Sequence, residues 1–218
     1  GSGFKIAMRD LSIRGAGNLL GSQQHGFIDS VGFDLYAQML QEAIDEKQTG
    51  IKKEEKIDLE ILLPYDAYLP DSYIPDGFQK IQMYKRVKAV ESEKDYEDLL
   101  DELMDRFGNM PLEAERLMRI ARMKVWAKVA GVESIKEKNG QLVVKISSSG
   151  TASTNGAALV EASMAYGRTV GFQMDQNQQL IMTINEKNSG KHHPFDVLEA
   201  MMKVLPDARK ESKPIVGV

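Results

Sequence analysis

The strongest constraint on the fold is a change in hydrophobic spacing at Gly131. Before this glycine, most apolar residues recur every three to four positions, which is typical of amphipathic helices. After it, residues 132–137 and 142–147 have the composition of strands, and the Asn139-Gly140 pair between them favours a hairpin turn. Helices and short strands without regular β-α-β alternation predict an α+β domain.

Three helices are expected ahead of the hairpin, over residues 76–90, 92–107 and 111–130. Ser92 with Asp95 is typical of a helix start, and Gly108 of a helix end. The apolar residues expected to face the core on the first helix are Phe78, Ile81, Tyr84 and Val87. Those on the second are Tyr96, Leu99, Leu100, Leu103 and Met104.

The remaining predicted elements are shorter. Strands are expected at residues 57–63 and 180–184, and helices around 159–166 and over 194–205. Residues 147–156 are rich in serine, threonine and glycine and predict a mobile loop. The tyrosines of the proline-punctuated loop after residue 63 are expected to pack that loop onto the domain. They are Tyr65, Tyr68 and Tyr73.

The N-terminal region is expected to form a helix-loop-helix segment. An amphipathic helix over residues 4–14 leads into a loop with four glycines, and a second helix runs to about Lys47. Residues 51–56 are a mixed-charge stretch, which is typical of a linker. The predicted organisation is therefore residues 1–50, a linker at 51–56, and a compact α+β domain at 57–218.

Composition excludes several classes of protein. The 218 residues carry a formal net charge of −4, which argues against a protein that coats nucleic acid by bulk charge. The absence of cysteine excludes disulfides, thiolate nucleophiles and cysteine-ligated zinc, and it fits a reducing, cytoplasmic setting. No apolar run is long enough to span a membrane, so no membrane partner is expected. The first residue is not methionine, which favours a piece of a longer protein.

No catalytic residue, metal site or cofactor site is expected in this chain. The P-loop pattern does not occur, so the chain cannot by itself be a P-loop ATPase. Gly15, Gly17 and Gly21 are spaced one residue too far apart for a dinucleotide fingerprint and follow a predicted helix rather than a strand. Adjacent His192 and His193 do not converge easily on a metal.

Several segments together resemble one family. Residues 4–21 and 24–26 closely resemble the translocation motif shared by the bacterial transcription-repair coupling factors (Mfd) and the fork-remodelling helicase RecG. Residues 31–36, 71–76 with 83–86, and 103–108 resemble the coupling factors specifically. RecG lacks a domain that corresponds to the second half of the chain, so the chain resembles a C-terminal fragment of a coupling factor.

The resemblance implies a parent protein that uses ATP and magnesium to move along double-stranded DNA. Such a parent displaces RNA polymerase stalled at a lesion and recruits the nucleotide excision repair protein UvrA. Residues 1–26 would couple ATP hydrolysis to movement. The matching motif residues are Arg9, Arg14, Gly15, Gly17, Gly21 and Gln24, of which Arg14 and Gln24 match the coupling residues.

Residues 57–218 would form the C-terminal regulatory domain. In the family this domain packs on a UvrB-like N-terminal module and hides the surface that binds UvrA. The matching contact residues are Glu102, Asp105 and Arg106, whose i, i+3, i+4 spacing places them on one face of the predicted helix. A solvated helix end is the alternative from the residues alone.

A second hypothesis from a different class is a stand-alone nucleic-acid-binding module. Lys5, Arg9, Arg14 and the basic residues between Lys80 and Lys88 would then contact phosphate. This hypothesis predicts binding by the isolated chain that falls steeply with salt.

Overall fold

The computed structural model describes residues 33–45, 57–187 and 190–209. They belong to two compact units: a helical unit, Pro64–Val129, and a sheet unit formed by the described residues up to Leu63 and from Ala130 onward. The mixture of helices with one sheet confirms the predicted α+β class. Residues 46–56 lie outside the described part, so the linker at 51–56 and the limits of 1–50 and 57–218 stay predictions.

The helical unit contains three helices, each close to its predicted limits. They are α5 (Gly77–Lys88), α6 (Glu93–Phe107) and α7, which runs from Leu112 to Ala130. The Asp76 carboxylate accepts hydrogen bonds from the backbone N–H groups of the first turn of α5, and the Ser92 hydroxyl caps α6 in the same way. Such caps satisfy N–H groups that have no partner inside the helix.

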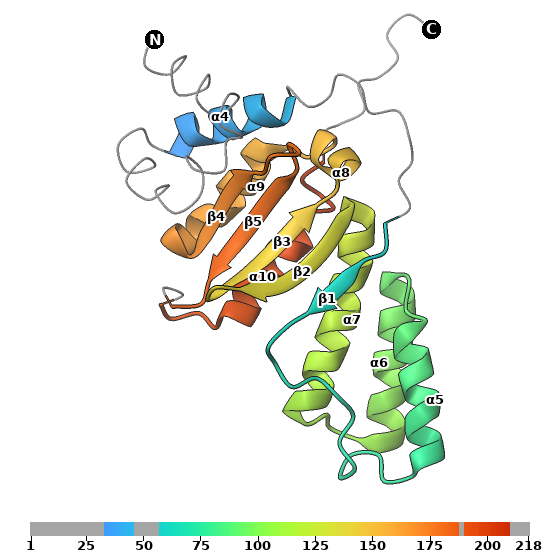
Figure 1. Ribbon diagram of the computed structural model, residues 1–218. Helices are drawn as coiled ribbons and strands as arrows, with labels where there is room; N and C mark the ends of the chain where they lie inside the picture. Colours follow the sequence, from blue (N-terminus) through green and yellow to red (C-terminus); the bar gives the residue numbers. More distant parts are fainter. Residues whose placement is uncertain (1–32, 46–56, 188–189, 210–218) are drawn as a thin grey trace, which may run out of the picture. The chain divides into compact units, whose positions relative to one another are not determined.

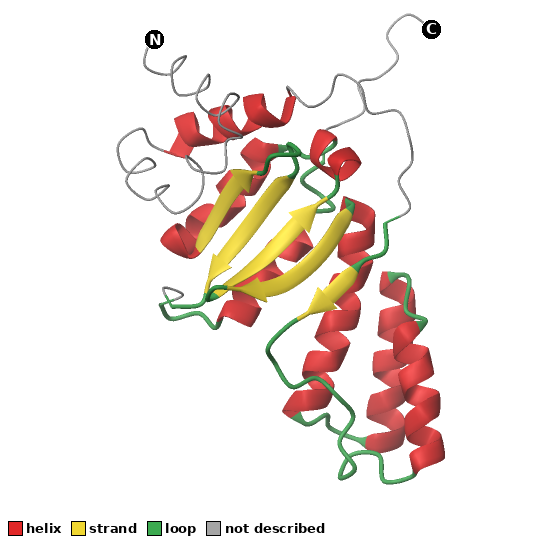
Figure 2. Cartoon of the chain, in the orientation of Figure 1, coloured by secondary structure: helices red, strands yellow, loops and turns green. Residues whose placement is uncertain are grey.

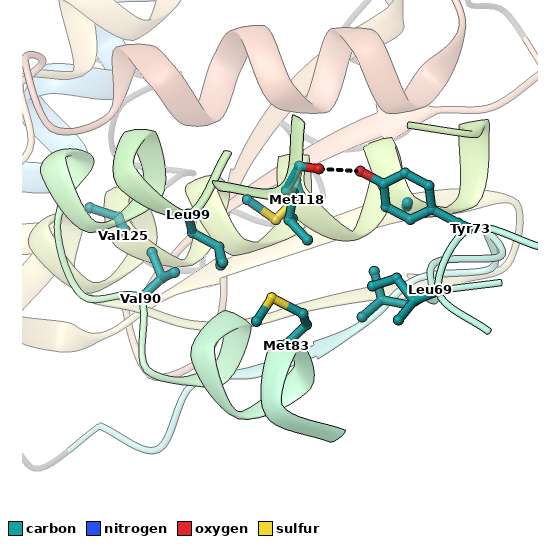
Figure 3. Close-up of a cluster of buried hydrophobic side chains, with 10 residues drawn as sticks. Leu69, Tyr73, Met83, Val90, Leu99, Met118 and Val125 are labelled. Carbon is teal, nitrogen blue, oxygen red and sulfur yellow. Dashed lines mark hydrogen bonds between the residues drawn. The ribbon is translucent and has the colours of Figure 1, made fainter. Parts of the chain in front are cut away.

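One apolar core holds this unit together, and Figure 3 shows it in close-up. Leu69 and Tyr73 from the loop ahead of α5 pack with Met83, Leu99 and Met118, one side chain from each helix in turn. Met83, Leu99 and Met118 are each no more than 2% exposed. Loop and helices therefore share a single core, and Tyr73 packs as predicted.

The predicted inward face of α5 is wrong in its first turns, although Val87 packs against the core as predicted. Phe78 is 71% exposed and Ile81 is 56% exposed, whereas Met83 is buried. Because a helix turns about 100° per residue, Phe78 and Met83 point about 140° apart. Met104 of α6 is likewise exposed, while its neighbour Leu103 is buried.

The sheet unit is built on one mixed sheet (Figures 1 and 2). Among the described residues, five strands lie in the order β1-β2-β3-β5-β4, with β1 parallel to β2 and the other neighbours antiparallel. The strands are β1 (Glu60–Leu62), β2 (Val132–Lys138), β3 (Gln141–Ile146), β4 (Val170–Met174) and β5 (Leu180–Asn185). The predicted hairpin and the strand near 180 are confirmed, and β4 is an additional strand.

Helices cover one face of this sheet. Alternate residues of β3 and β5 are fully buried, and α10 (Pro194–Val204) lies behind the sheet in the view of Figure 1. The side chains that α10 buries are Phe195, Val197, Leu198, Met201 and Met202. His193 is the N-cap of α10, and its Nδ1 accepts from the N–H of Phe195 at 3.1 Å.

The prediction of a mobile loop at residues 147–156 is wrong. The segment forms α8 (Ser148–Ala152) and the start of α9 (Gly156–Ser163). The Ser147 hydroxyl caps α8, and the Thr151 hydroxyl accepts the N–H of Leu180 at 2.9 Å. Both side chains are fully buried, so the small residues allow close packing here instead of mobility.

Helix α4 (Phe33–Asp45) packs on α9 in the sheet unit. The buried Tyr36 hydroxyl donates to the carbonyl of Phe172, and burial raises the pKa of Tyr36 above its ordinary value. The Gln41 side-chain oxygen accepts the N–H of Gly156 at 2.6 Å, at the N-terminus of α9. The predicted helix-loop-helix segment is described only in its second helix, which is α4.

Candidate interdomain contact surface

The family-predicted contact residues lie in the last two turns of α6. Glu102 is half-buried, while Asp105 and Arg106 are exposed. Helix α6 ends at Gly108, whose φ of 81° is a conformation that glycine adopts without strain and whose N–H donates to the carbonyl of Met104 at 3.0 Å. Gly108 is therefore the local signal that ends α6, and the candidate contact residues precede it directly.

Tyr73 holds this helix end in place from the preceding loop. Its hydroxyl lies 3.2 Å from the Leu103 carbonyl and 3.1 Å from the Gly108 carbonyl, both of which accept from it. Burial raises the pKa of the Tyr73 hydroxyl above its ordinary value. The Tyr73 and Phe107 rings lie 5.8 Å apart, and the Arg106 guanidinium lies 5.0 Å from the Phe107 centroid.

Glu102 connects α6 to α5. Its carboxylate forms an ion pair with Arg86 of α5, and its distance to the Arg106 guanidinium is 3.8 Å. Glu102 is thus already paired within the helical unit. Of the three candidate contact residues, Asp105 and Arg106 are exposed and can be reached by a partner. Sequence reasoning missed the pairing of Arg86 with Glu102, since the register of α5 against α6 cannot be deduced from one sequence.

The charges at this site favour a weak and reversible contact. Ion pairs between solvent-exposed groups contribute about 0–1 kcal/mol each, because water already stabilises both charges. Charged surfaces of this kind influence partner choice and association rate more than affinity. The arrangement can select a partner without holding it permanently.

The predicted motif residues Arg9, Arg14, Gly15, Gly17, Gly21 and Gln24 lie outside the described residues. Their assignment to a DNA-movement motif stays a prediction.

The basic face of α5 is partly neutralised. Lys80 pairs with Asp71, and its ammonium group lowers the pKa of that carboxyl. Arg86 pairs with Glu102. Two of the cations that a nucleic-acid-binding module would use are therefore already engaged by carboxylates, which weakens the phosphate-binding hypothesis.

We searched the described part of the chain for metal sites, membrane-spanning helices and polar hollows. It contains no group of three or more histidine, cysteine, aspartate or glutamate side chains placed to hold a metal. None of its helices is both long and apolar enough to cross a membrane. A polar hollow beside β1, β2 and β3 contains Lys136 and Lys145, but they lie 2.9 Å from Glu60 and 3.8 Å from Asp175.

Comparison with known proteins adds three findings. The TRCF domain family model matches residues 63–157. The transcription-repair-coupling factor of Bacillus subtilis (strain 168) is 48% identical over 212 residues, which is 97% of this chain and 18% of that protein. That of Staphylococcus haemolyticus (strain JCSC1435) is 49% identical over 189 residues, 86% of this chain and 16% of that protein.

A solved structure supports the fold. The crystal structure of the C-terminal domain of a transcription-repair coupling factor superposes with a TM-score of 0.59 and 24% identity, covering 71% of this chain and 93% of that one. The present chain therefore shares that domain's architecture, while it spans less than a fifth of the length of the sequence relatives.

Proposed function

The chain belongs to the transcription-repair coupling factor family, and from that premise we propose that it is the C-terminal part of an ATP-driven double-stranded DNA translocase. The parent displaces stalled RNA polymerase and recruits UvrA for nucleotide excision repair in the cytoplasm. The residues from 57 onward restrain UvrA binding by packing on the parent's UvrB-like module. The residues before 27 couple ATP hydrolysis to movement.

The observation that carries the restraining role is the exposed pair Asp105 and Arg106 at a helix end that Tyr73 hydrogen-bonds. Tyr73 fixes the end of α6, and Arg86 with Glu102 fixes α6 against α5. Two opposite charges held in a defined place can select one complementary surface. Their small energy per contact suits a clamp that opens, because release is a population shift between closed and open forms.

Charge reversal in the full-length parent tests this role. Asp105→Arg should raise the affinity for UvrA, because the closed form loses a favourable contact and gains a repulsive one. The measurement is UvrA binding by surface plasmon resonance or calorimetry. Glu115→Arg is the matched control, since it makes the same charge change at an exposed position of α7. Equal UvrA affinities for all three proteins would reject the clamp.

The coupling role has its own test. Arg14→Ala in the parent should leave ATP hydrolysis largely intact and abolish movement along DNA, because the residue is assigned to transmission and not to the nucleotide site. Triplex displacement measures movement, and phosphate release measures hydrolysis. If the variant moves along DNA at the parental rate, Arg14 does not couple ATP hydrolysis to movement.

A further inference from the structure

The chain contains two Asn-Gly pairs, and the structure places them in different surroundings. Asn139-Gly140 forms the turn between β2 and β3, and Asn155-Gly156 lies at the start of α9. When glycine follows asparagine, the next backbone nitrogen can reach the asparagine side chain easily, because glycine has no Cβ to obstruct the approach. The two pairs therefore share one reactive sequence, and their surroundings decide whether it reacts.

The Asn139-Gly140 turn leaves both reacting groups accessible. The two residues have φ values of 53° and 77°, as expected in a tight two-residue hairpin turn. Asn139 is exposed, and nothing lies within 4 Å of a Cβ added at Gly140. Among the described residues, no hydrogen bond holds the Asn139 side chain or the Gly140 N–H group. The tip of the turn can thus change conformation with the loss of few contacts.

At Asn155-Gly156 the same groups are held in place. The Asn155 side-chain oxygen accepts the N–H of Ala158 at 3.1 Å and caps α9. The Gly156 N–H donates to the Gln41 side-chain oxygen at 2.6 Å. Gly156 is buried, and a Cβ added there would lie 2.9 Å from the Ile44 side chain. The groups that would react are therefore each engaged in a hydrogen bond within a packed segment.

We propose that Asn139 is a site of spontaneous deamidation and that the fold protects Asn155 from the same reaction. The Gly140 amide nitrogen loses its proton to hydroxide and attacks Asn139 Cγ. A bond forms between this nitrogen and Cγ, the bond from Cγ to Nδ2 breaks, and ammonia leaves with a proton taken from water. Water then opens the cyclic imide at either carbonyl and leaves aspartate or isoaspartate at this position.

The product changes the hairpin turn in two ways. Either product adds a negative charge next to Lys138, and isoaspartate also adds one carbon atom to the main chain. Lys138 pairs with Gln141 across the hairpin, and the Gly140 carbonyl accepts the N–H of Glu186, just after β5, at 3.1 Å. Because loop length sets the register of a hairpin, the longer turn should disturb this end of the sheet.

The test compares the two asparagines within one peptide. The full-length parent is incubated at neutral and at mildly alkaline pH, and cleavage after glutamate then releases residues 138–161, which contain both sites. Fragmentation by mass spectrometry assigns each converted residue. Asn139 should convert at least about tenfold faster than Asn155, because local opening costs less free energy at a turn than in a packed segment. The rate at Asn139 should rise with pH, because the attacking nitrogen must lose its proton.

Two comparisons separate the effect of the fold from that of the sequence. In urea, where neither pair is held, the two conversion rates should become similar. Gln41→Ala should raise the rate at Asn155 and leave the rate at Asn139 unchanged, because it frees the Gly156 N–H. Equal rates at the two sites of the folded protein, or faster conversion at Asn155, would overturn the inference. So would a difference that persists unchanged in urea, since it would come from the neighbouring sequence.

Discussion

Gly150 occupies a position that excludes any side chain. A Cβ placed there would lie 2.5 Å from the Ala130 carbonyl oxygen and 2.8 Å from the Ile146 side chain. The closest neighbour is backbone, which cannot rotate away as the end of a flexible side chain can. This glycine therefore sets how closely α8 packs on the residues that precede β2.

Gly150→Ala should destabilise the sheet unit by about 1–3 kcal/mol, the usual cost of forcing extra atoms into a packed core. Urea unfolding followed by far-UV circular dichroism measures the change. Gly77→Ala is the control, because nothing lies within 4 Å of its added Cβ. A free energy of unfolding for Gly150→Ala equal to that of the unsubstituted chain would show that this packing is not tight.

At the scale of elements, Glu93 ties the start of α6 to α7. Its carboxylate accepts the indole N–H of Trp126 at 2.6 Å and the Nε–H of Arg122 at 3.2 Å. The Arg122 guanidinium also lies 4.9 Å from the Trp126 ring and 5.2 Å from the Tyr96 ring. One acidic side chain thus orients a cation between two aromatic rings.

Glu93→Ala should lower the stability of the helical unit by about 1–3 kcal/mol, because two donors lose a charged acceptor. Trp126 is the single tryptophan of the chain, so its fluorescence during urea unfolding reports on this unit. Lys94→Ala, at the adjacent exposed position, should leave the urea midpoint of unfolding unchanged. A shift of the same size in both variants would mean that the Glu93 contacts contribute nothing specific.

Sequence reasoning located most elements because their start and end signals are local. Asp76, Ser92 and Gly108 mark helix ends, and Asn139-Gly140 marks the hairpin, as the structure confirms. The face that each helix buries depends on its neighbours, so the i+3 series beginning at Phe78 was wrong for Phe78 and Ile81 and right for Val87. Tertiary packing also orders residues 147–156, which composition alone predicts to be mobile.

Only part of the candidate contact surface could be predicted from the sequence. Spacing places Glu102, Asp105 and Arg106 on one face of a helix, and the resemblance supplies their role. The pairing of Arg86 with Glu102 joins residues of two helices, and the exposure of Phe78 and Ile81 depends on how those helices pack. Neither feature follows from local periodicity.

At the scale of the whole molecule, the described residues form two compact units. The helical unit carries the candidate surface, and the sheet unit is a separate compact body to which α4 is fastened through Tyr36 and Gln41. The negative net charge of the chain and the paired cations of α5 weigh against the phosphate-binding hypothesis. We propose that this domain keeps the UvrA-binding surface of the parent closed.

Removal of the domain tests that claim most directly. The dissociation constant for UvrA should be measured for the full-length parent, for Asp105→Arg, and for a parent that ends before residue 57. UvrA should bind the shortened protein most tightly, Asp105→Arg should approach that affinity, and the intact parent should bind most weakly. A shortened protein that binds UvrA no more tightly than the intact parent would contradict it.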